Sequence, residues 1–182
     1  MARLCTLATN MEPTLQYVEK PRQCMACLPC INPSFNSLLV FGCSKARKTS
    51  FLKRIITCTL PFEVNSSVVS VGYTDYKYQV IEVSEHVLDG EEGERILGAI
   101  TRLRAVVIFI LDASGACCQG IAQQVSLFRR LRSCLVGKPI SLVCKKIDLR
   151  PMANITGEDW DMLKQIEGEA SCTLSSVRNP LF

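Results

Sequence analysis

A buried strand that runs directly into a glycine, a polar loop and a helix constrains this fold more than any other feature. Residues 37–41 are an apolar run that stops at Gly42, as a buried strand does. The loop after it ends at Lys48 and Thr49, and apolar residues at helical spacing follow from Phe51. The segment matches the phosphate-loop pattern G-x-x-x-x-G-K-[ST] at the first glycine, the lysine and the threonine. It therefore predicts an α/β domain with a phosphate site at the end of its first strand.

This loop has most of the groups that phosphate and magnesium need. In such loops backbone N–H groups hold the phosphates, the lysine neutralises the β/γ charge, and the hydroxyl reaches magnesium. The candidate phosphate-binding residues are Gly42, Ser44, Lys45, Lys48, Thr49 and Ser50, with Thr49 as the magnesium ligand. Arg47 stands where the pattern has its second glycine. Because a glycine there allows close approach and unusual dihedrals, we expect the arginine side chain to crowd the phosphates.

A second partial motif follows the strand expected at residues 78–83. GTP-binding domains place D-x-x-G here, where the aspartate holds the magnesium shell and the glycine N–H meets the γ-phosphate. In this chain Glu82 stands in for the aspartate and Glu85 for the glycine. Glu85 would bring a negative charge near the γ-phosphate and leave the switch without its flexible glycine.

A third partial motif follows the strand expected at residues 139–144. The guanine-reading motif is N-K-x-D, in which the carboxylate accepts two hydrogen bonds from guanine and the lysine stem packs over the base. Lys146 and Asp148 match, whereas Lys145 replaces the asparagine. The three partial matches occur in the order of the strands, so together they predict a GTP-binding domain.

Strand and helix patterns alternate along the rest of the chain. We expect strands at residues 37–41, 68–73, 78–83, 105–111, 139–144 and 170–174, and helices at residues 48–57, 93–103, 123–135 and 157–166. This order predicts a Ras-like α/β domain with a mostly parallel sheet flanked by helices. We expect residues 1–36 to be an irregular leader or the remnant of an N-terminal helical domain. Residues 37–182 would then be a truncated G domain whose last helix is missing.

Amino-acid composition limits the other kinds of binding site that this chain could hold. The 182 residues hold 11 cysteines and one histidine, with a net charge of +4. The sequence has no apolar run of about 18 residues, so we expect no membrane partner. Without an export signal we expect reduced thiols in the cytosol or nucleus. Cys24, Cys27 and Cys30 could supply three thiolates to zinc or an iron–sulfur cluster, but the lack of a suitably spaced fourth ligand favours simple cysteine enrichment.

One stretch resembles a known family. The stretch V-G-x-x-D-Y-K-Y, from Val71 to Tyr78, resembles that of the nucleolar GTP-binding (Nog) proteins, relatives of the Obg GTPases. Further matches lie at residues 28–33, 99–105, 111–112, 124–128 and 138–139. The resemblance covers roughly residues 16–175. It implies a Ras-like domain that binds GTP or GDP with magnesium, in a nucleolar factor of large ribosomal subunit assembly.

The resemblance also implies roles for particular residues. Gly42, Lys48 and Thr49 would correspond to phosphate and magnesium binding, and Lys146 and Asp148 to guanine recognition. Ser171 would lie in the last base-contacting loop, and Ser66 near the switch threonine. The implied partners are pre-ribosomal large-subunit proteins or rRNA, and the implied location is the nucleus and nucleolus.

Three functions remain open at this point. The eroded motifs suit a GTP-binding protein with little or no hydrolysis, a pseudo-GTPase that acts as a protein interaction module, or a non-functional duplicate. Whether the chain is an enzyme is therefore undecided. Three arginines at positions 129, 130 and 132 lie on an expected helix, where they form either a solvated face or an RNA contact.

Overall fold

The computed structural model describes residues 11–19, 22–23, 31–55, 63–64, 69–74, 78–114, 119–146, 155, 157–170 and 175–176. Residues 11–19 are helical. The later elements are β1 (Asn36–Gly42), α2 (Lys48–Ile55), β2 (Glu63–Val64), β3 (Val69–Tyr73), β4 (Tyr78–Val83), the 3-10 helix η1 (Glu85–Leu88), α3 (Gly90–Ile100), β5 (Ala105–Asp112), α4 (Ile121–Cys134), β6 (Ile140–Lys145), α5 (Gly157–Ala170) and β7 (Ser175–Ser176). Among these described helices, none is long and apolar enough to cross a membrane.

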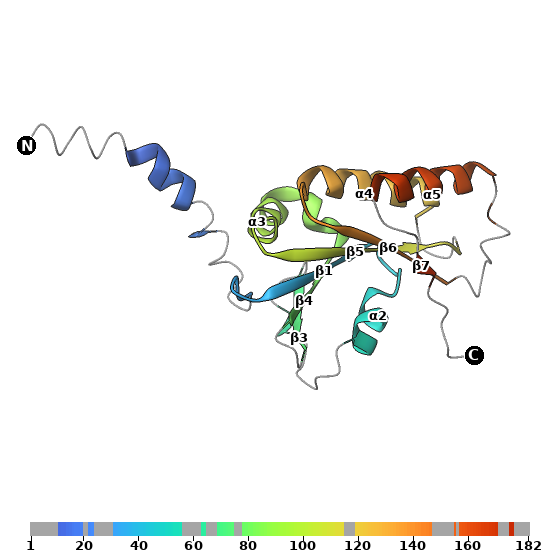
Figure 1. Ribbon diagram of the computed structural model, residues 1–182, viewed down its shortest axis with the longest axis horizontal. Coiled ribbons are helices and arrows are strands. Elements are labelled where there is room, and N and C mark those ends of the chain that lie inside the picture. The colour runs from blue at the N-terminus through green and yellow to red at the C-terminus, as the bar shows by residue number, and fades with distance from the viewer. Residues whose placement is uncertain are drawn as a thin grey trace, which may run out of the picture.

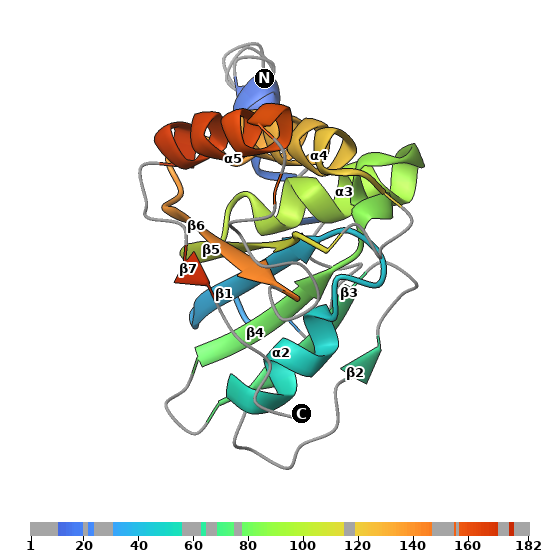
Figure 2. The same cartoon turned by 90° about the vertical axis from the view of Figure 1, so that its right-hand side faces the viewer.

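A single sheet with β1 at its centre organises the domain. Its strand order is β2-β3-β4-β1-β5-β6-β7, as Figure 2 shows for most of its width. Strand β1 pairs in parallel with β4 and β5, and β6 and β7 continue the parallel half. Strands β2 and β3 run antiparallel at the other edge. The carboxyl ends of β1, β4, β5 and β6 therefore meet at one edge of the sheet, where ligands bind in such folds.

The two faces of the sheet are covered unequally. Helices α3, α4 and α5 cover one face, whereas α2 lies on the other (Figures 1 and 2). Leu39 and Phe41 of β1 belong to the large core cluster, and Val40 between them packs into a small cluster with Leu52 of α2. This alternation follows from the two-residue period of a strand. It explains why β1 reads as continuously apolar, because both of its faces are buried.

Several helix boundaries differ from those expected: α3 ends at Ile100 and not at residue 103, and α4 spans Ile121–Cys134 and not residues 123–135. Helix α5 continues past residue 166 to Ala170, because Leu163, Ile166 and Ala170 form one buried stripe at helical spacing. The strand expected at residues 170–174 is therefore wrong at its first residue, its residues 171–174 lie outside the described residues, and β7 lies at Ser175–Ser176. Helix α3 begins at Gly90 and not at residue 93, with acidic side chains in its first turn.

A short segment before β1 is tied to the sheet by Gln79 of β4. The fully buried amide of Gln79 donates to the carbonyl of Asn32 at 2.8 Å and to Ser37 Oγ at 2.7 Å. Its oxygen accepts from the Asn32 N–H at 3.0 Å, and Ile31 joins the large core cluster. Residues 31–35 thus contribute to the folded unit, while the division of the chain at residue 36 stays a prediction.

Candidate nucleotide site

The phosphate loop begins at Gly42, which ends β1. Its φ of 149° lies in a region that side chains disfavour. A Cβ there would lie 2.5 Å from the carbonyl oxygen of Ile110 on β5. Close packing of two parallel strands therefore requires glycine at this position, independently of any ligand.

The loop keeps an unusual backbone path at the position of the missing glycine. Arg47 has φ 58° and Lys45 has φ 62°, both in the left-handed region. A non-glycine residue costs roughly 1–2 kcal/mol in that conformation. Arg47 is exposed, so the arginine has the backbone conformation that suits a glycine and directs its side chain toward solvent.

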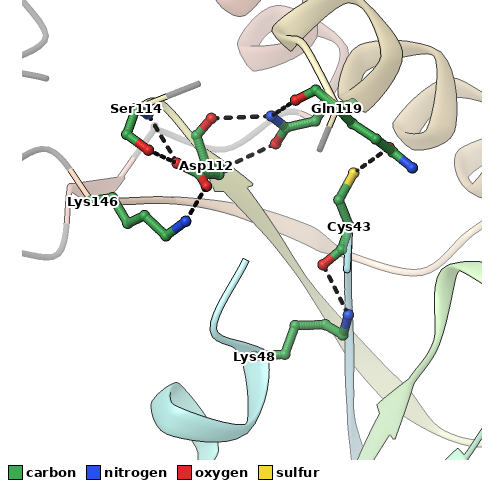
Figure 3. Close-up of polar contacts among 7 residues, drawn as sticks. Cys43, Lys48, Asp112, Ser114, Gln119 and Lys146 are labelled. Atoms are coloured by element: carbon green, nitrogen blue, oxygen red, sulfur yellow. Dashed lines mark hydrogen bonds and ion pairs between the residues drawn. The ribbon is translucent and has the colours of Figure 1, made fainter. Parts of the chain in front are cut away.

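Lys48 lies across the loop. Its ammonium donates to the carbonyl oxygens of Gly42 at 2.8 Å and Cys43 at 3.1 Å, the latter visible in Figure 3. Burial lowers the pKa of Lys48, and the carboxylates of Glu82 and Glu85 oppose that shift. The lysine thus lies among loop carbonyls and two carboxylates.

Thr49 and Glu82, which the motifs predict near magnesium, contact each other. The Thr49 hydroxyl lies 3.0 and 2.9 Å from the two carboxylate oxygens of Glu82, which β4 carries opposite Val40 of β1. A hydroxyl and a carboxylate are oxygen ligands of the kind that magnesium prefers. These two side chains therefore fit a magnesium ion, which would supply charge neutralisation to bound phosphates.

Glu85 contacts the phosphate loop directly. One oxygen of its carboxylate accepts from the backbone N–H of Ser44 at 3.1 Å and from Gln119 Nε2 at 3.0 Å. The Cys43 thiol in turn donates to Gln119 Oε1 at 2.9 Å (Figure 3). Sequence reasoning missed Gln119, because no motif position marks it and its partners lie 34 and 76 residues away.

The end of the candidate site that carries Lys146 of the predicted guanine motif, here called the guanine end, is built around Asp112, which the motifs did not single out. Its side chain is fully buried, and it forms an ion pair with Lys146, which has φ 60°. The Ser114 N–H and hydroxyl donate to the same carboxylate at 2.9 and 2.6 Å. Burial raises the pKa of Asp112, but the hydrogen bonds from Lys146 and Ser114 outweigh this effect and hold the pKa below its usual value. The ammonium of Lys146 is thus bound to a buried carboxylate (Figure 3).

Lys145, which replaces the motif asparagine, points elsewhere. It is buried, and its ammonium lies 5.4 Å from the centre of the Phe51 ring on α2. This cation–π contact places a charge over the small core cluster. The other predicted base and switch residues, Asp148, Ser171 and Ser66, lie outside the described residues.

Two further sets of predicted residues are the cysteines considered as metal ligands and the arginines of α4 considered as an RNA contact. Cys24, Cys27 and Cys30 lie outside the described residues, and within the described ranges no cluster of three or more His, Cys, Asp or Glu could hold a metal. Cysteines 43, 134 and 144, the cysteines that the structure describes, form no disulfide bond with one another. On α4, Arg129 and Arg132 both pair with Glu169 of α5, at 3.1 and 3.7 Å.

Comparisons with known proteins give the same assignment as the motifs. The family model "Nucleolar GTP-binding protein 1 (NOG1)" matches residues 95–148. The chain is 37% identical to nucleolar GTP-binding protein 1 of Arabidopsis thaliana and 32% identical to that of Dictyostelium discoideum. These matches cover 95% and 93% of this chain and 27% of each relative. This chain therefore spans about a quarter of the length of the curated relatives it matches.

A solved structure shares the fold. The crystal structure of a nucleolar GTP-binding protein 1 from Plasmodium falciparum superposes with a TM-score of 0.66 at 23% identity. The match covers 81% of this chain and 78% of that one. The sheet order, the phosphate-loop position and the sequence relatives agree with the resemblance seen at Val71–Tyr78, so the chain belongs to the nucleolar GTP-binding (Nog) family.

Proposed function

We propose that this chain is a Nog-type domain that binds guanine nucleotide with magnesium and hydrolyses GTP slowly or not at all. One observation carries the binding part. The loop after β1 keeps a phosphate-loop path, with Lys48 across it and the Thr49–Glu82 pair beside it. These groups supply the cation, the hydroxyl and the carboxylate that a magnesium-bound nucleotide needs.

The loss of hydrolysis follows from the switch positions. Catalysis of phosphoryl transfer relies on positioning the attacking group and stabilising the charge that spreads over the γ-phosphate oxygens. Glu85 adds a carboxylate at the loop where the motif has a glycine, and it is hydrogen-bonded to Ser44 and Gln119. An added negative charge at this place opposes the same transition state that the loop would stabilise.

The cellular setting of this proposal comes from the relatives, which are named nucleolar GTP-binding proteins. We infer a location in the nucleus and nucleolus, and partners among pre-ribosomal large-subunit proteins or rRNA. Of the three arginines on α4, Arg129 and Arg132 pair with Glu169, and Arg130 is exposed.

A specific observation favours a second function, a pseudo-GTPase that acts only as a protein interaction module. Groups of the loop that would contact phosphate or magnesium already have partners within the chain. The Ser44 N–H is bound to Glu85, and the Thr49 hydroxyl is bound to Glu82. If these contacts outcompete nucleotide, the domain keeps its fold and loses its ligand.

Binding of fluorescent GDP and GTP with magnesium separates the two functions. We expect the full chain to bind with a Kd below roughly 10 μM, a free energy near −7 kcal/mol. Arg47→Gly should bind more tightly, because a glycine lets the phosphates approach the backbone closely where the arginine has a Cβ. Arg47→Ala is the matched control, since it removes the side chain but leaves a Cβ in the left-handed region.

A failure to bind refutes the proposed function only if the proteins tested are folded. If wild type and both variants melt cooperatively but bind neither nucleotide at 100 times that concentration, nucleotide binding is refuted and the interaction module remains.

A further inference from the structure

The carboxylate of Glu85 behaves as an anion already bound to the phosphate loop. It accepts the Ser44 backbone N–H at 3.1 Å. Ser44 is the third residue of the eight-residue loop motif, so its N–H belongs to the set of amides that such loops direct at phosphate oxygens. A carboxylate oxygen at hydrogen-bond distance from such an amide makes the contact that a phosphate oxygen would otherwise make.

Lys48 shows which end of a nucleotide this anion would replace. The lysine of a phosphate loop reaches the β- and γ-phosphates. Here the Glu85 and Glu82 carboxylates both lie close enough to the Lys48 ammonium to raise its pKa against the effect of burial. Of the two, Glu82 contacts Thr49, the proposed magnesium ligand, whereas Glu85 contacts the loop backbone. Glu85 therefore lies at the terminal-phosphate end of the loop.

Two further side chains hold Glu85 in this place. Gln119 donates to the same carboxylate oxygen that accepts from Ser44. The Cys43 thiol fixes the other end of the Gln119 amide, at 2.9 Å. The carboxylate is thus oriented by Gln119, from the segment before α4, which Cys43 of the loop after β1 holds in turn, so its contact with the loop is part of a connected network.

We propose that Glu85 occupies the terminal-phosphate position and makes this site select a nucleoside diphosphate over a nucleoside triphosphate. The inference rests on the proposed function, that the loop binds guanine nucleotide. A diphosphate leaves the Ser44–Glu85 contact intact, whereas a triphosphate must displace the carboxylate or place its own charge beside it. The chain would then be held in one nucleotide state, without a cycle driven by hydrolysis.

A cavity beside Glu85 should limit the preference for diphosphate over triphosphate. Its volume is about 510 Å³, and its lining includes Glu85, Gln119, Gln123 and Arg130. The cavity gives the carboxylate room to leave the loop, and Arg130 supplies a positive charge there. We therefore expect triphosphate to bind more weakly than diphosphate by about 10- to 100-fold, the range set by one hydrogen bond to a charged group.

The test compares fluorescent GDP with a fluorescent, non-hydrolysable GTP analogue, using the full chain with magnesium. Glu85→Gln keeps the size and the acceptor oxygen but removes the charge, so it should tighten GTP at least fivefold and change GDP less than twofold. Glu85→Gly removes the side chain and should bring the two Kd values within about threefold of each other. Glu91→Gln, an exposed change on α3, is the matched control and should leave the ratio as in wild type.

Each other outcome overturns either the diphosphate selectivity or nucleotide binding itself. Equal Kd values in wild type, or an unchanged ratio in both Glu85 variants, overturn the selectivity and leave nucleotide binding intact. If no variant with a cooperative melt binds either nucleotide, the proposed function fails, and the selectivity fails with it. If Glu85→Gly does not fold, Glu85→Gln alone decides, because it preserves the hydrogen-bond geometry.

Discussion

The two ends of the candidate site hold their charged groups in opposite ways. At the phosphate end, the half-buried carboxylates of Glu82 and Glu85 contact Thr49 and the loop backbone. At the guanine end, Lys146 is paired with Asp112, whose side chain is fully buried (Figure 3). A ligand can replace half-buried contacts, because solvent compensates the displaced groups. A buried ion pair cannot be opened without leaving a charge in the core.

This difference shows that a retained motif residue need not be retained for the ligand. Lys146 matches the guanine motif, but in this structure its ammonium neutralises a core carboxylate. Lys48 matches the phosphate motif, and its ammonium is held over the loop by the neutral carbonyls of Gly42 and Cys43. We therefore expect substitutions at the guanine end to act mainly on stability, and those at the phosphate end mainly on ligand binding.

The largest effect should come from breaking the buried pair. Lys146→Met removes the cation and leaves the Asp112 carboxylate uncompensated, so the free energy of unfolding should fall by about 3–5 kcal/mol. Urea unfolding followed by circular dichroism measures it. Lys53→Met, on an exposed position of α2, is the control and should change stability by less than about 0.5 kcal/mol. Equal losses in the two variants would show that the pair is not structural.

The same ion pair should make the free energy of unfolding depend on pH in the acidic range. The pKa of Asp112 is lower in the folded chain than its ordinary value of 3.8. A carboxylate with a depressed pKa contributes stability that is fully present above its unfolded pKa and is lost as pH falls through its folded pKa. We expect Asp112 to contribute to an unfolding transition that begins below about pH 4. Asp112→Asn should flatten this part of the curve in acid melts, and an unchanged slope would contradict the assignment.

The smallest effect concerns the strained loop itself. Arg47→Gly should raise the free energy of unfolding by about 1 kcal/mol, because glycine adopts φ 58° without strain. Arg47→Ala should give no such gain, since it keeps the Cβ. Thermal melts without nucleotide measure both variants, and a gain of equal size in each would assign the effect to the arginine side chain and not to the backbone.

Local sequence patterns were sufficient to predict the positions of the main strands and helices. The apolar run at residues 37–41, the Lys48–Thr49 start of a helix and the β-branched run at 105–111 each depend on neighbours within a few residues. The structure places β1, α2 and β5 at these segments. The end of α5 was missed, because whether Ala170 closes a helix or opens a strand depends on its burial against the core.

The amino-acid pattern alone established the order of strands and helices, the position of a phosphate loop and membership of the Nog family. These follow from short periodicities and motifs, which a linear chain carries in itself. The partners of Glu85 and Lys146 were decided only by the folded structure. Glu85 meets Ser44 across 41 residues, and Lys146 reaches Asp112 across 34, because the parallel register sets Asp112 opposite Lys145. Such contacts are set by sheet register and burial, which no local spacing encodes.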